Sequence, residues 1–296
     1  MKFQYGGQAL IEGVMMRGRN SLAMAVRKSN NDITCKIEPI NSIGNKYKIL
    51  KWPFLRGTVA LIESLVLGIK ALTYSANESA ETEEEELTKG EIIFTIALSL
   101  GLGILLFFLT PAGLAHLLKS VSTDPLIQNL IEGIFRIGIF VLYVVGISLI
   151  KDIQRVFQYH GAEHKVIHAY EAGEPLRVEN CRKFTTLHPR CGTSFLLIVM
   201  VISILVFSLI SVEVLWWRLL SRVLLLPVIA GISYEFLKFA GKHAAHPVVK
   251  VLNWPGMMLQ KLTTREPDDS QLEVAIRALE KVIEQDQSCN EQMKAV

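Results

Sequence analysis

The chain has 296 residues, of which 50% are hydrophobic, and its formal net charge is only +3. No basic stripe alternates with aromatic residues, so the composition excludes a nucleic-acid-binding protein. The hydrophobic residues gather in blocks, and four of these blocks reach the length of about 20 residues that crosses a bilayer. We therefore predict a mainly α fold, a polytopic membrane protein with about four transmembrane helices. The predicted spans are Ile92–Leu118, Leu130–Ile150, Ser194–Val212 and Leu219–Phe239.

Residues 1–90 are predicted to form an N-terminal region in the cytoplasm and on the membrane surface. Segment 6–18 reads GGQALIEGVMMRG, and we interpret it as a helix docked on the membrane. Its one acid, Glu12, is then either solvated or buried as a polar group of a site, because a carboxylate in apolar surroundings needs a partner. Residues 22–28 and 33–40 flank an Asn-Asn-Asp turn, which predicts a small β-hairpin.

The apolar segment Thr58–Tyr74 carries Glu63 and Lys70 and is predicted to be an interfacial or re-entrant helix. If it crossed the membrane, it would reverse every later helix and place loop 151–193 outside, against the positive-inside rule. The acidic run Glu81–Glu86 that follows is interpreted as a solvated linker.

The distribution of Lys and Arg sets the predicted orientation of the four spans. These residues are plentiful before Ile92, in loop 151–193 and after Phe239, and they are scarce in the two remaining loops. By the positive-inside rule, both termini and loop 151–193 face the cytoplasm, and residues 91–240 form the membrane domain. The second span continues without a breaker, so a single helix over residues 130–172 fits the pattern.

Loop 151–193 holds three histidines spaced four residues apart, His160, His164 and His168. Because each residue turns a helix by about 100°, all three share one face with Glu171. The segment His160-Gly-Ala-Glu163-His164 matches H-x-x-E-H, the inverted form of the zincin motif. Two imidazoles at this spacing can bind one metal ion, while Glu163 holds a water and acts as the general base.

Further candidate ligands lie around this motif. His168 and Glu171 could complete the first metal site or begin a second one. His188 and Cys191 stand three residues apart in a turn, where both can reach one ion, and a thiolate favours zinc or another thiophilic metal. Glu235, at the end of the fourth span, lies at a separation comparable to that of the downstream carboxylate ligand in inverted zincins. The competing interpretation makes the histidines interfacial and Glu235 part of an ion pair.

Residues 241–296 form the predicted C-terminal cytoplasmic tail. Ser270 and Glu273 fit a capping box, and Gln271–Gln285 has one apolar face, so this segment predicts an amphipathic helix. The helix would pack on the cytoplasmic domain or on a second copy in a homo-oligomer.

Five blocks of the sequence resemble the YqhQ-like family of bacterial membrane proteins. The blocks are GGQALIEGVMMRG, YHGAEHKVIHAYE, LHPRCGTSFLLIV, LPVIAGISYEFLK and LTTREPDDSQLEVAI. The family is a domain of unknown function that carries the label of a predicted metal-dependent enzyme. The resemblance implies a place in the bacterial plasma membrane and a divalent metal ion, and it supplies neither a substrate nor a catalytic residue.

The function we expect is a metal-dependent hydrolase, with zinc as a candidate ion, that acts at the cytoplasmic face of the membrane. Its partners would be the lipid bilayer and a membrane-embedded or lipid-linked substrate. The alternatives are a non-enzymatic protein that binds, transports or senses a divalent metal, and a membrane scaffold. Transport is disfavoured because the spans hold few polar residues, and these lie near the span ends. They are Glu132, Arg136, Arg222 and Glu235.

Overall fold

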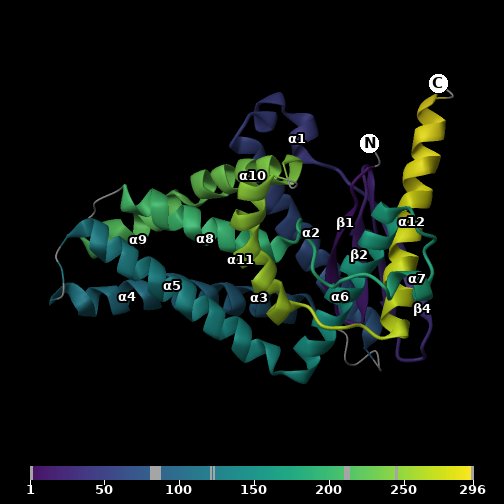
Figure 1. The fold of residues 1–296 in the computed structure, drawn as a ribbon, viewed down its shortest axis with the longest axis horizontal. Coiled ribbons are helices and arrows are strands. Elements are labelled where there is room, and N and C mark those ends of the chain that lie inside the picture. Colours follow the sequence, from purple (N-terminus) through teal and green to yellow (C-terminus); the bar gives the residue numbers. More distant parts are fainter. Residues whose placement is uncertain are drawn as a thin grey trace.

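The computed structural model describes residues 3–80, 88–120, 122, 124–209, 214–243 and 246–294. Figure 1 shows two parts, an N-terminal sheet flanked by helices and a bundle of helices that extends away from it. The first strands and the C-terminal helix both belong to the sheet part, although they stand at opposite ends of the sequence. The predicted linker Glu81–Glu86 lies outside the described residues.

The sheet is an antiparallel meander in the order β1-β2-β3-β4. The last two strands confirm the predicted hairpin. The helix predicted for residues 6–18 is wrong, because this segment forms the first two strands and the turn between them. Glu12 lies in that turn, with a φ of 50°. The strands are β1 (Gly6–Leu10), β2 (Gly13–Arg17), β3 (Ser21–Arg27) and β4 (Ile33–Pro39).

Helices cover both faces of the sheet, which explains why β2 does not alternate between polar and apolar residues. On one face, α2 (Leu55–Ser79) packs Ala71 against Met15. The other face is covered by α6 (Lys151–Ala172) and α12 (Asp269–Lys294). A strand that is buried on both faces is apolar at nearly every position, so periodicity alone does not distinguish it from a helix.

Three described helices are long and apolar enough to cross a membrane: Leu55–Ser79, Lys89–Ser120 and Pro125–Ile147. Lys89–Ser120 contains α3 (Lys89–Ile104), the π-helical η3 (Leu105–Leu109), α4 (Thr110–Leu117) and the 3₁₀ turn η4 (Leu118–Ser120). The first of the three corresponds to α2, whose C-terminal half is bound to the sheet. There the Ile11 N–H donates to Ser75 Oγ at 3.2 Å, and Lys70 pairs with Glu38. The interfacial position of α2 stays a prediction.

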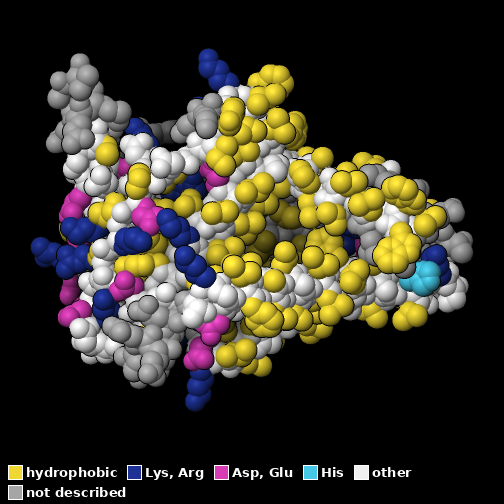
Figure 2. All heavy atoms as spheres, turned by 180° about the vertical axis from the view of Figure 1, so that it is seen from behind, with side chains coloured by type: hydrophobic (Ala, Val, Ile, Leu, Met, Phe, Trp, Pro, Cys, Tyr) yellow, Lys and Arg dark blue, Asp and Glu magenta, His cyan; other side chains and the backbone are white. Residues whose placement is uncertain are grey.

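The third and fourth predicted spans differ from the single long helices that the sequence suggests. The third, α8 (Gly192–Ser208), is apolar and 17 residues long. The fourth is divided at Leu225 into α9 (Leu215–Leu224) and α10 (Leu226–Lys242). On the face that Figure 2 shows, hydrophobic side chains cover most of the helical bundle, while Lys, Arg and acidic side chains gather around the sheet part. This distribution supports association of the bundle with a membrane.

The single helix predicted over residues 130–172 is wrong, because it is divided into α5 (Pro125–Ser148) and α6. Ile150 between them has an extended backbone, with a ψ of 127°. The Ser148 carbonyl accepts hydrogen bonds from Gln154 at 3.1 Å and from Arg265 at 2.9 Å. These bonds hold the bend that turns α6 onto the sheet.

The C-terminal region contains α11 (Pro247–Thr263) and α12. The capping box of α12 begins two residues earlier than predicted, because Asp268 accepts from the Gln271 N–H and the Gln271 side chain accepts from the Asp268 N–H. The helix continues to Lys294, beyond the predicted end at Gln285. The short helices are α1 (Ile43–Lys46), η1 (Lys48–Lys51) and α7 (Val178–Cys181).

Candidate metal centre

The predicted histidine face exists on α6. This segment contains no proline, and Gly173 ends the helix in the left-handed conformation, with a φ of 80°. The face meets the loop before α8 and the end of α11. The rings of His160 and His164 are 4.4 Å apart, and those of His168 and His188 are 4.5 Å apart. Four histidines from two segments therefore form one continuous row.

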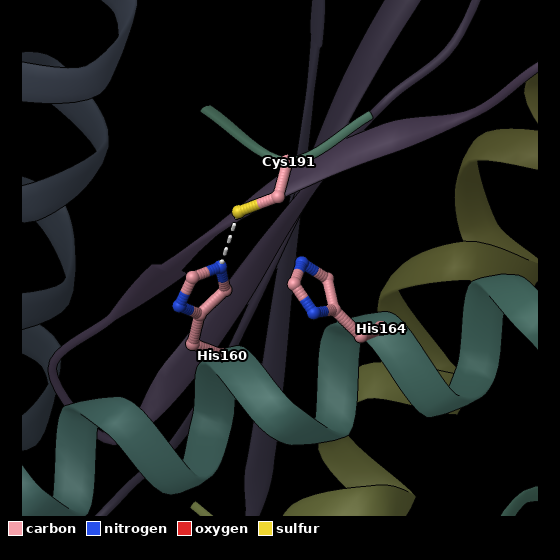
Figure 3. A group of neighbouring side chains, drawn as sticks. All are labelled: His160, His164 and Cys191. Atoms are coloured by element: carbon pink, nitrogen blue, oxygen red, sulfur yellow. Dashed lines mark hydrogen bonds between the residues drawn. The ribbon is translucent and has the colours of Figure 1, made fainter. Parts of the chain in front are cut away.

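His160, His164 and Cys191, which we call the HHC cluster, offer ligand atoms that all lie within 4.8 Å of one another. Figure 3 shows both rings on α6 turned toward the thiol, which comes from the loop above them. His160 Nε2 lies 3.2 Å from Cys191 Sγ. Two tetrahedral zinc ligands, one nitrogen and one sulfur, stand about 3.5 Å apart. This pair therefore has nearly the spacing that one bound ion requires.

Backbone carbonyls orient both rings of the HHC cluster. Nδ1 of His160 faces the Thr263 carbonyl oxygen at 2.8 Å, and Nδ1 of His164 faces the Thr186 carbonyl oxygen at 2.5 Å. Because a carbonyl only accepts, each Nδ1 carries the hydrogen and each Nε2 keeps its lone pair. Histidine ligands of metals show this same arrangement, in which the second nitrogen donates to a carbonyl or carboxylate. The donor set and its orientation therefore fit a divalent metal ion.

Buried polar contacts fix the loop that carries Cys191. The fully buried amide of Gln260 accepts from the His188 N–H at 2.8 Å and donates to the His188 carbonyl at 2.9 Å. The same amide donates to Ser194 Oγ at 3.0 Å. Cys191 caps α8, and its sulfur accepts from the Thr193 N–H. Sequence reasoning missed Gln260, because a lone glutamine in a helix carries no recognisable motif.

Glu163 lies beside the HHC cluster and is 5% exposed. One carboxylate oxygen is 3.9 Å from His164 Nε2. Burial raises the pKa of Glu163, and a hydrogen bond from the Gly7 backbone opposes that shift. A carboxylate with a raised pKa takes up a proton more readily, which suits a general base.

A second group, His168, Glu171 and His188, also has ligand atoms within 4.8 Å of one another. The positions of the hydrogens on the histidine rings of this second group are less suitable for binding a metal ion than those in the HHC cluster. The Arg190 N–H donates to His188 Nδ1, so Nε2 of the neutral ring carries the hydrogen. That Nε2 is buried without a hydrogen-bond partner among the described residues and lies 3.6 Å from the Glu171 carboxylate, which pairs with Arg190. Burial, followed by Arg190 and His168, lowers the pKa of His188 to about 2, so the ring is neutral.

Two acids singled out in the sequence lie outside both groups. Glu235 forms a two-bond ion pair with Arg56, at 2.5 and 2.6 Å, and the structure does not bring it to the histidines. Glu12 pairs with Arg155 and accepts from the Tyr159 hydroxyl at 3.2 Å. Glu12 therefore anchors the β1–β2 turn to α6.

A cavity of about 830 Å³ adjoins the HHC cluster. One side is polar and contains the cluster, Glu163 and Arg190. The cavity is also lined by β1 backbone and by apolar side chains of α2, α6 and α8. A ligand in this cavity would meet the open side of the HHC cluster and the Glu163 carboxylate together.

Replacing Gly161 by alanine is expected to destabilise the protein by about 1–3 kcal/mol, the usual effect of overpacking. A Cβ at this position would overlap the carbonyl oxygen of Arg265, so α6 and the segment that follows α11 would have to separate. Gly138→Ala on α5 is the control, because a Cβ there has no neighbour within 4 Å. Thermal unfolding in one detergent compares the two variants. Equal midpoint temperatures of unfolding for the two variants would contradict the close contact between Gly161 and the Arg265 carbonyl.

Sequence comparisons relate the chain to proteins of unknown function. The family model described as "Protein of unknown function (DUF1385)" matches residues 52–285. The chain is 37% identical over 293 residues to the "Uncharacterized protein YqhQ" of Bacillus subtilis (strain 168), and the match covers 94% of this chain and 92% of that protein. The comparison with solved structures found no significant match.

Proposed function

The chain belongs to the DUF1385 family of proteins of unknown function, and we propose that it is a metal-dependent hydrolase acting at a membrane surface. The observation that carries the proposal is the HHC cluster with the buried Glu163 beside it. His160, His164 and Cys191 would hold the ion. A bound zinc or similar ion would polarise a substrate carbonyl and lower the pKa of a water molecule.

Each residue of the site has a separate role in this proposal. The carbonyls of Thr186 and Thr263 keep the two imidazoles in the ligating tautomer. Glu163 takes a proton from the attacking water and returns it to the leaving group. Its burial supports that role, because desolvation favours the protonated form of a carboxyl group.

The proposed location is the cytoplasmic face of the bacterial plasma membrane, with both termini in the cytoplasm. The charge of loop 151–193 and the apolar surface of the bundle support it. The cavity's apolar side favours a substrate that comes from the membrane, either a protein segment or a lipid-linked molecule.

The test is the metal content of the detergent-purified protein. We expect about one zinc, iron or manganese ion per chain, the stoichiometry of a mononuclear site. The double variant His160→Ala/His164→Ala should lose it. The control His243→Ala/His246→Ala should keep it, because these residues bond only to their own helix ends within the described structure. A wild-type protein that stays metal-free after metal is added would overturn the proposal.

The contact between His160 and Cys191 favours a second candidate, a thiol nucleophile activated by histidine. The 3.2 Å distance and the orienting Thr263 carbonyl match a nucleophile, its base and the group that orients the base. A chelator separates the two candidates. Hydrolysis that a chelator stops and zinc restores requires the metal, while hydrolysis that continues in chelator requires the thiol alone.

A further inference from the structure

The strand β1 is an edge of the sheet and pairs only with β2 among the described residues. The hairpin closes at Leu10 and Gly13, so Leu10, Gln8 and Gly6 direct their backbone bonds toward β2. The N–H and C=O groups of Gly7 and Ala9 therefore point away from β2, and the Gly7 N–H donates to the Glu163 carboxylate.

The pairing of β2 with β3 confirms that the backbone groups of successive residues point to alternate sides of a strand. The Arg27 N–H donates to the Glu12 carbonyl at 2.7 Å, so even-numbered residues of β2 face β3 and odd-numbered residues face β1. The opposite edge, β4, ends in Pro39 and carries Lys36 and Glu38. Proline and charged side chains are common means of preventing further strand pairing. The β1 sequence, GGQAL, contains none of these residues.

This edge lies directly beside the proposed catalytic group, and a strand added at Gly7 would replace the hydrogen bond from its N–H to Glu163. A Cβ on Gly7 would stand 3.0 Å from Oε1 of Glu163, and a Cβ on Gly6 would meet nothing within 4 Å. Residues 3–9 line the same cavity as the HHC cluster. An extended chain laid along β1 would therefore pass the cluster at backbone distance.

Apolar side chains form the other wall of this cavity. Leu65 of α2 and Leu196 of α8 both line it and are 57% and 49% exposed. A strand alternates its side chains between two faces. Every second side chain of an added strand would then meet this wall, and the backbone would meet β1.

We infer that the cavity binds an extended polypeptide, which pairs with β1 as a fifth strand and presents one peptide bond to the HHC cluster. This inference rests on the proposed hydrolase and names its substrate class. In the reaction, the water oxygen bonds to the peptide carbonyl carbon and Glu163 takes one water proton. The C–N bond then breaks, and the amine leaves with the proton from Glu163. Strand addition of this kind draws its affinity from main-chain hydrogen bonds.

The test uses the full-length, zinc-loaded Glu163→Gln variant in detergent, which should bind peptide without cleaving it. The probe is a pool of fluorescent ten-residue peptides with apolar residues at alternate positions, measured by fluorescence anisotropy. Adding Ala9→Pro should weaken binding about five- to tenfold, because it removes one outward-facing hydrogen-bond donor. Proline is tolerated at such an edge position. Adding Ile37→Pro, which alters the opposite edge, is the control and should leave binding within about twofold.

A second measurement does not depend on the folding of any variant. The same peptide pool with every backbone nitrogen methylated should not bind, because it cannot donate to the edge. Binding that survives both methylation and Ala9→Pro would overturn the inference. The inference would also be overturned if the zinc-loaded protein did not bind the peptide pool but bound a lipid-linked probe. A wild-type protein that takes up no metal would overturn the hydrolase proposal itself, so the two failures are distinguishable.

Discussion

Glu163→Gln is expected to leave the metal in place and to lower hydrolysis by about 10²–10⁴-fold, the usual contribution of a general base. Glutamine keeps the volume of the side chain and cannot accept the proton. The HHC cluster does not include this carboxylate, so its ligand atoms stay within 4.8 Å of one another. The measurement pairs metal content with cleavage of the peptide pool, followed by mass spectrometry.

Glu174→Gln is the matched control for this prediction. It makes the same chemical change just after the end of α6, at an exposed position. Metal content and cleavage should both equal those of the wild-type protein. If Glu163→Gln cleaved the pool at the wild-type rate, the carboxylate would not be the base. If no wild-type activity existed while the metal stayed bound, a metal carrier or sensor would become the better description.

The second large effect concerns the helical bundle. Glu132 of α5 is 2% exposed and accepts from Arg136 at 2.6 Å and from Arg222 of α9 at 3.3 Å. Asn129 also accepts from Arg222, at 2.9 Å. The Phe207 ring centroid lies 4.0 Å from the Arg222 guanidinium carbon. These buried charges therefore link helices that are far apart in sequence.

Glu132→Ala is expected to destabilise the protein by about 3–5 kcal/mol, because it leaves two buried guanidinium groups without this carboxylate. Glu235→Ala is the control, since it breaks the ion pair between Arg56 and Glu235. The side chains of these two residues are 33% and 25% exposed, respectively. The loss of a pair exposed to this extent should cost about 1 kcal/mol or less. Unfolding in one detergent, followed by circular dichroism, compares the variants. Equal losses would show that the buried network is no more important than a surface pair.

Local sequence information was sufficient for the parts of the site that one helix carries. The shared face of His160, His164 and His168 depends only on helical periodicity. Apolar block length likewise identified the membrane-associated bundle. The Asn-Asp turn identified β3 and β4, because turn chemistry is local.

Tertiary packing decided which distant residues meet at the site, and no local sequence pattern contains this information. Cys191 joins His160 only because Gln260, about 70 residues further along the chain, holds the intervening loop at both backbone groups of His188. The β1 edge reaches Glu163 because Gly7 has no side chain and lets the backbone approach the carboxylate. Likewise, the sequence shows no breaker at Ile150, where contacts from Gln154 and Arg265 hold the bend. The sequence by itself determined which residues can carry the chemistry, and long-range contacts determined which of them meet.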